Sequence, residues 1–232
     1  MKTPTNGPPR SGSSVDRVYE ALRSAIVMGH YPPGGPLRLH ELSEDLGVSL
    51  IPIREALRRL EVERLVDNRP YRGAVVASIS LSDVRDAYGT RILLESEALR
   101  RAWPNIDEEA LGVARNTLDE MFAAFEAGRM EEGAQLHGRY HFDLWARAES
   151  PWLDHLIRIL WSHTERYRNL ALVLQTPARA GKEYHQVVLA ALESRDLDSA
   201  ILHTREELSR ARDLVIEHLS DALGMKPETR PA

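Results

Sequence analysis

Three helical segments followed by two short β-prone runs constrain the fold of residues 15–78 most strongly. Each helical segment carries apolar side chains at helical spacing, and glycines and prolines separate the first two segments. The predicted helices cover residues 15–28, 39–46 and 49–63, and the β-prone runs cover residues 65–68 and 73–76. A short turn between the two runs predicts a hairpin. This order of elements is typical of a winged helix-turn-helix.

The rest of the chain carries helical patterns only. The expected helices cover residues 80–103, 107–127, 130–148, 151–173, 179–194 and 197–219. Their connections are short, so an antiparallel all-α bundle is predicted over residues 79–222, and the fold class is mainly α. Residues 1–14 are rich in Pro, Gly and Ser and are expected to form a flexible tail, as are residues 223–232.

Composition excludes several classes of protein. The chain of 232 residues has no cysteine, which excludes disulfides, thiolate catalysis and cysteine-ligated zinc and fits a reducing cytoplasm. Its apolar runs are too short to span a bilayer, and its first residues lack the apolar core of a secretory signal. We therefore expect a cytoplasmic protein without membrane contact. The net charge of −5 excludes a globally basic nucleic-acid binder but permits a local basic face.

The segment from Leu46 to Glu61, LGVSLIPIREALRRLE, resembles the recognition segment of the GntR family of transcription regulators. Residues 25–29 and 72–76 fit the same family pattern, so the resemblance covers residues 15–78. It implies that double-stranded DNA is the partner. Arg54 and Arg58 are four residues apart on one exposed face, as a helix in the major groove requires. The expected DNA-binding residues are Ser49, Leu50, Arg54, Arg58, Arg59, Arg72 and His40.

An alternative for these arginines is a solvated face paired with nearby glutamates. Residues 15–78 contain nine arginines and nine acids, so this part of the chain is formally neutral. Three positions also depart from the family pattern. Leu50 and Arg64 stand where the family usually has Arg and Gly, and His40 stands where some relatives have Arg. Because Leu50 cannot make bidentate contacts to guanine, an unusual operator is expected.

Residues 82–220 resemble the FCD ligand-binding domain of the FadR-like GntR subgroup. The residues that carry this resemblance are 86–95, 140–144, 183–188 and 196–200. Many members of the subgroup bind a divalent metal through one Asp and three His. Carried over by position, the resemblance implies the ligand set His137, His141, His185 and Glu207, with His203 in reserve. A set without sulfur suits Zn²⁺, Ni²⁺, Mn²⁺ or Fe²⁺.

The helical pattern agrees with this ligand set but leaves an alternative. His137 and His141 share one inward stripe, and His185 and Glu207 lie on the inward faces of two later helices. Each histidine alone could equally be an ordinary core residue bonded to a carbonyl.

Arg91, Glu95 and Arg168 are the candidate effector-binding residues. A guanidinium group matches a carboxylate in bidentate geometry, so Arg91 could bind a small organic acid beside the metal. The alternative is a buried structural ion pair between Arg91 and Glu95.

Together these features predict a homodimeric, ligand-responsive transcription regulator, a repressor by family resemblance, that senses a small organic acid through a metal site. One alternative is a metal-responsive or fatty-acyl-responsive regulator without a carboxylate effector. A metal-dependent hydrolase is the second alternative. Because the sequence offers no motif that places a general base beside the metal, the chain is not expected to be an enzyme.

Overall fold

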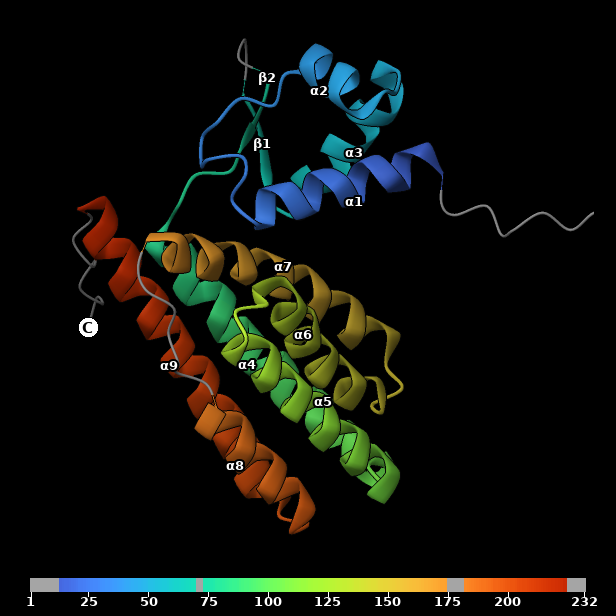
Figure 1. Ribbon diagram of the computed structural model, residues 1–232, viewed down its shortest axis with the longest axis vertical. Helices are drawn as coiled ribbons and strands as arrows, with labels where there is room; N and C mark the ends of the chain where they lie inside the picture. Colours follow the sequence, from blue (N-terminus) through green and yellow to red (C-terminus); the bar gives the residue numbers. More distant parts are fainter. Residues whose placement is uncertain (1–12, 70–72, 175–181, 225–232) are drawn as a thin grey trace, which may run out of the picture. The chain divides into compact units, whose positions relative to one another are not determined.

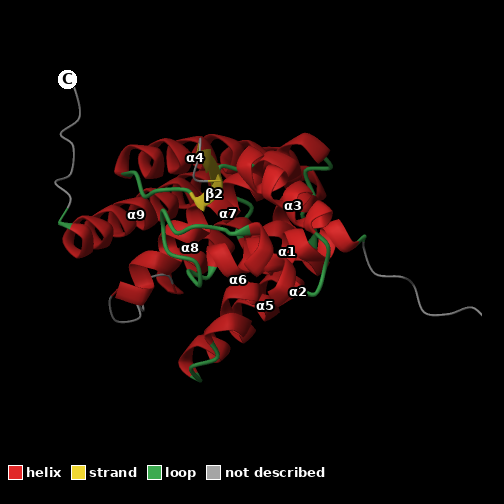
Figure 2. Cartoon of the chain, turned by 90° about the horizontal axis from the view of Figure 1, so that it is seen from above, coloured by secondary structure: helices red, strands yellow, loops and turns green. Residues whose placement is uncertain are grey.

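The computed structural model describes residues 13–69, 73–174 and 182–224. The chain divides into two compact units, Met1–Ile79 and Ser80–Ala232. Helices make up most of the described residues, and the strands are confined to one hairpin (Figure 2). The mainly α fold class predicted from the sequence is therefore confirmed. The predicted tails lie almost wholly outside the described residues.

The first unit contains three helices and the hairpin, in the predicted order. Its elements are α1 (Ser14–Val27), α2 (Leu39–Leu46), α3 (Leu50–Val62), β1 (Val66–Arg69) and β2 (Gly73–Val76). Ser13 and Asp16 form a capping box that begins α1, and Gly47 ends α2 with a φ of 63°. The two strands are antiparallel, with Val66 opposite Val76. This is the winged helix-turn-helix that the sequence predicts.

The apolar face of α3 forms the centre of the first unit's core. Ile53, Ala56 and Leu60 of α3 are completely buried against Leu22 and Ile26 of α1 and their neighbours. Burial of an aliphatic side chain of this size stabilises the fold by about 1.5–3 kcal/mol. The apolar face thus fixes α3 and leaves its polar face toward solvent.

The second unit is the predicted helical bundle (Figure 1). Its elements are α4 (Leu81–Ala102), η1 (Trp103–Asn105), α5 (Glu108–Glu126), α6 (Met130–Ala146), α7 (Pro151–Leu174), α8 (Lys182–Glu193) and α9 (Leu197–Leu223). Short connections pair α5 with α6 and α8 with α9, and α4 packs against both α7 and α9. Each helix lies close to its predicted range, because the 3.6-residue apolar period was continuous in each segment.

Among the residues that the structure describes, two clusters of buried side chains hold the second unit together. The larger cluster joins α4, α5, α6, α8 and α9 around residues such as Leu111, Tyr140 and Leu192. The smaller cluster contains Ala98, Trp145, Ile157 and Trp161 and joins α4, α6 and α7. No helix in the described ranges combines the length and apolarity that a membrane crossing requires.

Candidate functional site

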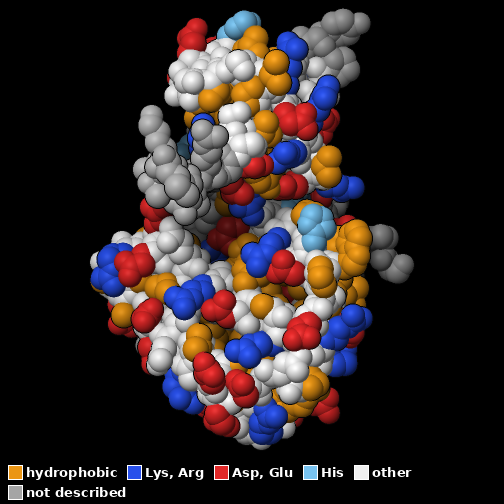
Figure 3. Space-filling view, turned by 90° about the vertical axis from the view of Figure 1, so that its right-hand side faces the viewer, with side chains coloured by type: hydrophobic (Ala, Val, Ile, Leu, Met, Phe, Trp, Pro, Cys, Tyr) orange, Lys and Arg blue, Asp and Glu red, His pale blue; other side chains and the backbone are white. Residues whose placement is uncertain are grey.

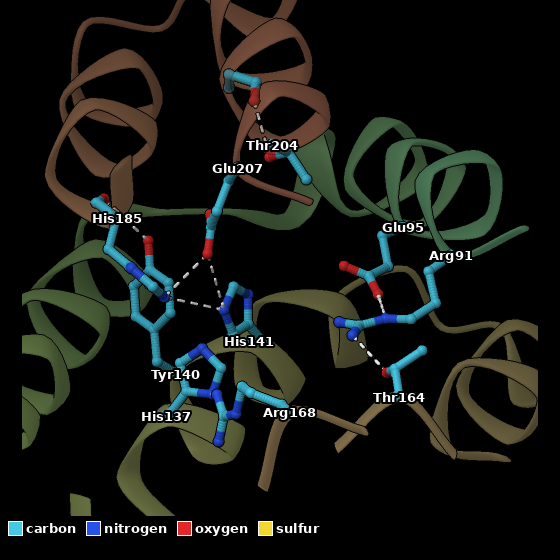
Figure 4. A network of polar contacts seen from close by, with 11 residues as sticks. Arg91, Glu95, His137, Tyr140, His141, Thr164, Arg168, His185, Thr204 and Glu207 are labelled. Atoms are coloured by element: carbon cyan, nitrogen blue, oxygen red, sulfur yellow. Dashed lines mark hydrogen bonds and ion pairs between the residues drawn. The ribbon is translucent and has the colours of Figure 1, made fainter. Parts of the chain in front are cut away.

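Four side chains that could ligate a metal meet inside the second unit. His137 and His141 come from α6, His185 comes from α8, and Glu207 comes from α9. One ligand atom of each residue lies within 4.8 Å of the others (Figure 4). The structure therefore brings together the whole set of four that the sequence predicts.

The spacing of these atoms fits a divalent cation. Nε2 of His185 lies 3.2 Å from Nε2 of His141 and 3.1 Å from Oε1 of Glu207. The same Glu207 oxygen is 3.8 Å from His141 Nε2. Donor atoms about 2.1 Å from a tetrahedral metal lie about 3.4 Å from one another. Three imidazoles and one carboxylate in this arrangement are a suitable donor set for Zn²⁺ or a related transition metal.

Burial sets the charge of these groups. It lowers the pKa of His137 and of His141 well below the ordinary histidine value, with a further contribution from nearby Arg168 at His137 and from His185 at His141. Burial also raises the pKa of Glu207. The two α6 histidines are therefore neutral at pH 7, which is the form that a metal ligand needs.

Aromatic neighbours hold the ligand rings in place. Trp145 stacks against His141 with ring centroids 5.1 Å apart. The Tyr140 hydroxyl donates a hydrogen bond to the backbone oxygen of His185 at 3.4 Å and so links α6 to α8. Contacts of this kind restrict the orientation of metal-ligating side chains.

Two arginines lie beside the cluster, and each is paired with a glutamate of its own helix. On α7, Arg168 bonds to Glu165 and also to Nδ1 of His137, at 3.2 Å. On α4, Arg91 donates to Glu95 at 2.6 Å.

The Arg91 group is deeply buried. Its guanidinium also donates to the Thr164 hydroxyl at 2.8 Å and lies over the Trp161 ring at 4.6 Å. Glu95 is fully buried, and burial raises its pKa to about 7 despite the opposing effect of Arg91. The ion pair considered for Arg91 and Glu95 is thus present. The same guanidinium remains close enough to the cluster to lower the pKa of His141.

The structure leaves the reserve ligand out of the cluster and places beside the cluster side chains that carry no signal in the sequence. His203, the reserve ligand, is bonded to Glu206 at 3.1 Å and is not one of the four clustered residues. Thr164 and Glu165 bond to Arg91 and Arg168 beside the cluster, and neither belongs to a motif. Residues of α7 reach the cluster only because α7 packs against α4 and α6.

The polar face of α3 is the candidate nucleic-acid interface. Arg54 and Arg58 are both exposed there, and Arg58 makes only a distant ion pair, 4.0 Å, with Glu55. Ile51, one turn before Arg54, has 77% of its surface exposed, although sequence analysis had not singled it out. These three residues share one stripe because they occupy helical positions i, i+3 and i+7.

The other residues predicted at the interface differ in their exposure and in their bonding partners. Ser49 is the exposed N-cap of α3, His40 is exposed on α2, and Leu50 is half-buried. Arg59 bonds to Asp16 of α1 at 2.8 Å, so the alternative of a paired surface arginine fits this residue. Arg72 lies outside the described residues.

The charge on the surface in view is mixed. On the face drawn in Figure 3, basic and acidic side chains are interspersed and neither sign covers a broad area. This agrees with the exposed ion pairs between neighbouring residues, such as those of Arg38 with Glu41 and of Arg100 with Glu97. The face in view therefore offers no broad basic surface.

Comparisons with known proteins agree with both units. Residues 14–76 match the gntR family of bacterial regulatory proteins, and residues 86–220 match the FCD domain. The chain is 32% identical to the uncharacterized HTH-type transcriptional regulator BphR of Paraburkholderia xenovorans, over 80% of this chain and 78% of BphR. It is 28% identical to the HTH-type transcriptional repressor RspR of Escherichia coli, over 88% of this chain and 91% of RspR.

A solved structure supports the fold. Escherichia coli McbR/YncC is 24% identical and superposes with a TM-score of 0.79, which covers 89% of this chain and 98% of that one. The matched relatives are transcription regulators, not enzymes, so the hydrolase alternative has no support among them. The chain belongs to the gntR family of bacterial regulatory proteins and is a DNA-binding transcription regulator with an FCD domain.

Proposed function

We propose that this regulator is a homodimeric repressor whose second unit binds a divalent metal and, next to the metal, a small organic acid. The four converging ligands carry this proposal, because ligand atoms of three imidazoles and a carboxylate lie within 4.8 Å of one another and those of His141 and Glu207 lie 3.1–3.2 Å from His185. The name of the E. coli relative RspR, a repressor, supports the direction of regulation.

The surroundings of the cluster favour an anionic effector. Arg91 and Arg168 both lower the pKa of His137, so both positive charges act on the place where the ligands meet. A metal ion bound there would supply an open coordination position for a carboxylate oxygen. The guanidinium groups would hold the other oxygens and set the orientation of the acid.

Two copies of the first unit would read DNA. The exposed stripe of Ile51, Arg54 and Arg58 suits a major groove, with arginines for guanine or phosphate and an isoleucine for a thymine methyl. A pseudo-palindromic operator needs one such stripe for each half-site, which is why a homodimer is part of the proposal. Sedimentation of the protein with and without operator gives the stoichiometry.

The DNA interface is tested on an operator selected from random duplexes. Arg54→Ala and Arg58→Ala should each weaken binding by about 1–3 kcal/mol where the arginine contacts a base, with specificity relaxed at that position. Ile51→Ala should change the preference at a thymine while leaving the salt dependence of binding unchanged. Arg100→Ala, an exposed arginine of α4 paired with Glu97, is the control. Full affinity in both α3 arginine variants would contradict this interface.

The effector is tested by thermal melting. We expect one member of a panel of small carboxylic acids to raise the melting temperature of the metal-loaded protein and to weaken its binding to the operator. The same acid should have no effect on protein treated with a chelator. If metal alone changes operator affinity and no acid does, the metal-responsive alternative is correct.

A further inference from the structure

Arg168 forms a hydrogen bond with the ring nitrogen of His137 that faces it. Nη1 of Arg168 lies 3.2 Å from Nδ1 of His137, and this contact joins α7 to α6 (Figure 4). A guanidinium group has only donors, so the imidazole must be the acceptor in this bond. His137 therefore carries its ring proton on Nε2, and its single lone pair, on Nδ1, is taken by Arg168.

A metal ion needs that same lone pair. A metal bound through Nδ1 would displace the guanidinium directly. If His137 ligated a metal through Nε2, its proton would have to move to Nδ1, where it would face the N–H of Arg168. In both cases the bond between Arg168 and His137 is incompatible with ligation by His137.

We propose that Arg168 competes with the metal for His137, so that metal loading releases this guanidinium and makes it available to the anionic effector. This inference rests on the proposed metal site. It assigns Arg168 two alternating partners, the His137 nitrogen before metal binding and a ligand anion after it. Metal and effector would therefore bind in a fixed order.

The other contacts of Arg168 suit this exchange. Its Nη2 remains bound to Glu165, three residues earlier on α7, which keeps the side chain beside the cluster. Its Nε is buried and has no hydrogen-bond partner among the described residues. After release from His137, the side chain would thus present donors at Nη1 and Nε that a ligand anion could use. Hydrogen bonds from a guanidinium to a carboxylate are charge-assisted and therefore strong.

Removal of the guanidinium should strengthen metal binding. The experiment titrates full-length, chelator-treated protein with Zn²⁺ and Co²⁺ and compares wild type with Arg168→Met, which retains much of the apolar stem. We expect the variant to bind metal about tenfold more tightly, because the lost bond to His137 no longer has to be broken. Arg158→Met, at an exposed arginine of α7 paired with Asp154, is the matched control and should leave the affinity unchanged. Equal metal affinity of wild type and Arg168→Met would overturn the proposal.

A double-mutant cycle separates the lone pair from simple charge repulsion. In a His137→Ala background the metal has three protein ligands, and Arg168→Met should then change the affinity much less than in wild type. The same gain in both backgrounds would mean that only the positive charge matters, and would overturn the proposal.

Direct observation of the ring proton gives an independent test. Nitrogen NMR of ¹⁵N-histidine-labelled protein, assigned with His137→Gln, should place the His137 proton on Nε2 before metal is added. A proton on Nδ1 in metal-free protein would refute the competition. If wild type and Arg168→Met both take up no metal, the metal site of the proposed function fails and this inference fails with it. Metal binding with the same affinity in both refutes this inference alone.

Discussion

The buried histidines should make the metal-free protein sensitive to acid, and His141 offers the clearest measurement. Only 8% of its surface is exposed, and burial lowers its pKa well below 6.5. In the unfolded chain the same imidazole takes up a proton near pH 6.5. Below that pH the unfolded state therefore binds a proton that the folded state does not. The stability contributed by neutral His141 is complete above pH 6.5 and is lost as the pH falls.

The magnitude follows from proton linkage. A difference of one bound proton between the folded and unfolded states changes the free energy of unfolding by about 1.4 kcal/mol for each pH unit. Wild-type stability relative to His141→Gln, which cannot be protonated, should therefore fall by about 1.2 kcal/mol between pH 6 and pH 5. Glu95 and Glu207 act in the opposite sense, because burial raises the pKa of both carboxyls and so favours the folded state in acid. Comparison of two proteins that share these carboxyls largely cancels their effect.

Urea unfolding in the presence of a chelator, repeated at several pH values, measures this difference. His155→Gln, which replaces an exposed imidazole of α7, is the control for the loss of a histidine. A stability difference between wild type and His141→Gln that does not change with pH would refute the assignment of a neutral, buried imidazole.

Two further changes test the backbone of each unit by the same unfolding assay. Arg64 has a φ of 58°, a left-handed conformation that strains an L side chain. Arg64→Gly should therefore stabilise the protein by about 0.5–1 kcal/mol. A loss of stability in this variant would contradict this account. A Cβ atom at Gly133 would lie 2.5 Å from the Phe125 ring where α6 crosses α5, so Gly133→Ala should destabilise the protein by about 1–3 kcal/mol. Gly138 lies on the same helix with open space around it, so the control Gly138→Ala should leave stability unchanged or raise it. Equal losses of stability in the two variants would show that contact with Phe125 is not the cause.

Local patterns were sufficient to predict the elements of both units. Ser80 accepts a hydrogen bond from the backbone N–H of Asp83, as expected where a helix begins, and α4 starts at the next residue. The departure at Arg64 also has a structural meaning, because the family usually places Gly there and the backbone is left-handed. Periodicity and turn chemistry act over a few residues, so one sequence can reveal them.

Contacts between distant helices could not be predicted in this way. The Asp83 carboxylate accepts hydrogen bonds from His163, at 2.5 Å, and from Tyr167, at 2.8 Å. Both partners lie on α7, about eighty residues away, and no spacing rule connects them to Asp83. Arg168 was a candidate for the effector alone, and its bond to His137 appears only when α6 and α7 are packed together.

The exposure of individual residues at the start of a helix was a second feature that the sequence could not predict. Leu50 is one of the expected DNA-binding residues, and the structure leaves it half-buried beside Ile51, which has 77% of its surface exposed. A shift of one residue rotates a side chain by about 100° around the helix axis, so neighbouring residues of a helix can differ strongly in exposure. The ligand set was less sensitive, because the resemblance fixed four positions on three helices at once.

Metal content of the purified protein tests the central claim most directly. We predict about one equivalent of a divalent transition metal in wild type, loss of that metal in His141→Ala, and retention in His203→Ala, whose imidazole is bonded to Glu206 outside the cluster. Protein that folds and binds its operator but holds no metal, before and after incubation with Zn²⁺, Ni²⁺, Mn²⁺ and Fe²⁺, would contradict the claim and leave the three histidines as buried residues of the bundle.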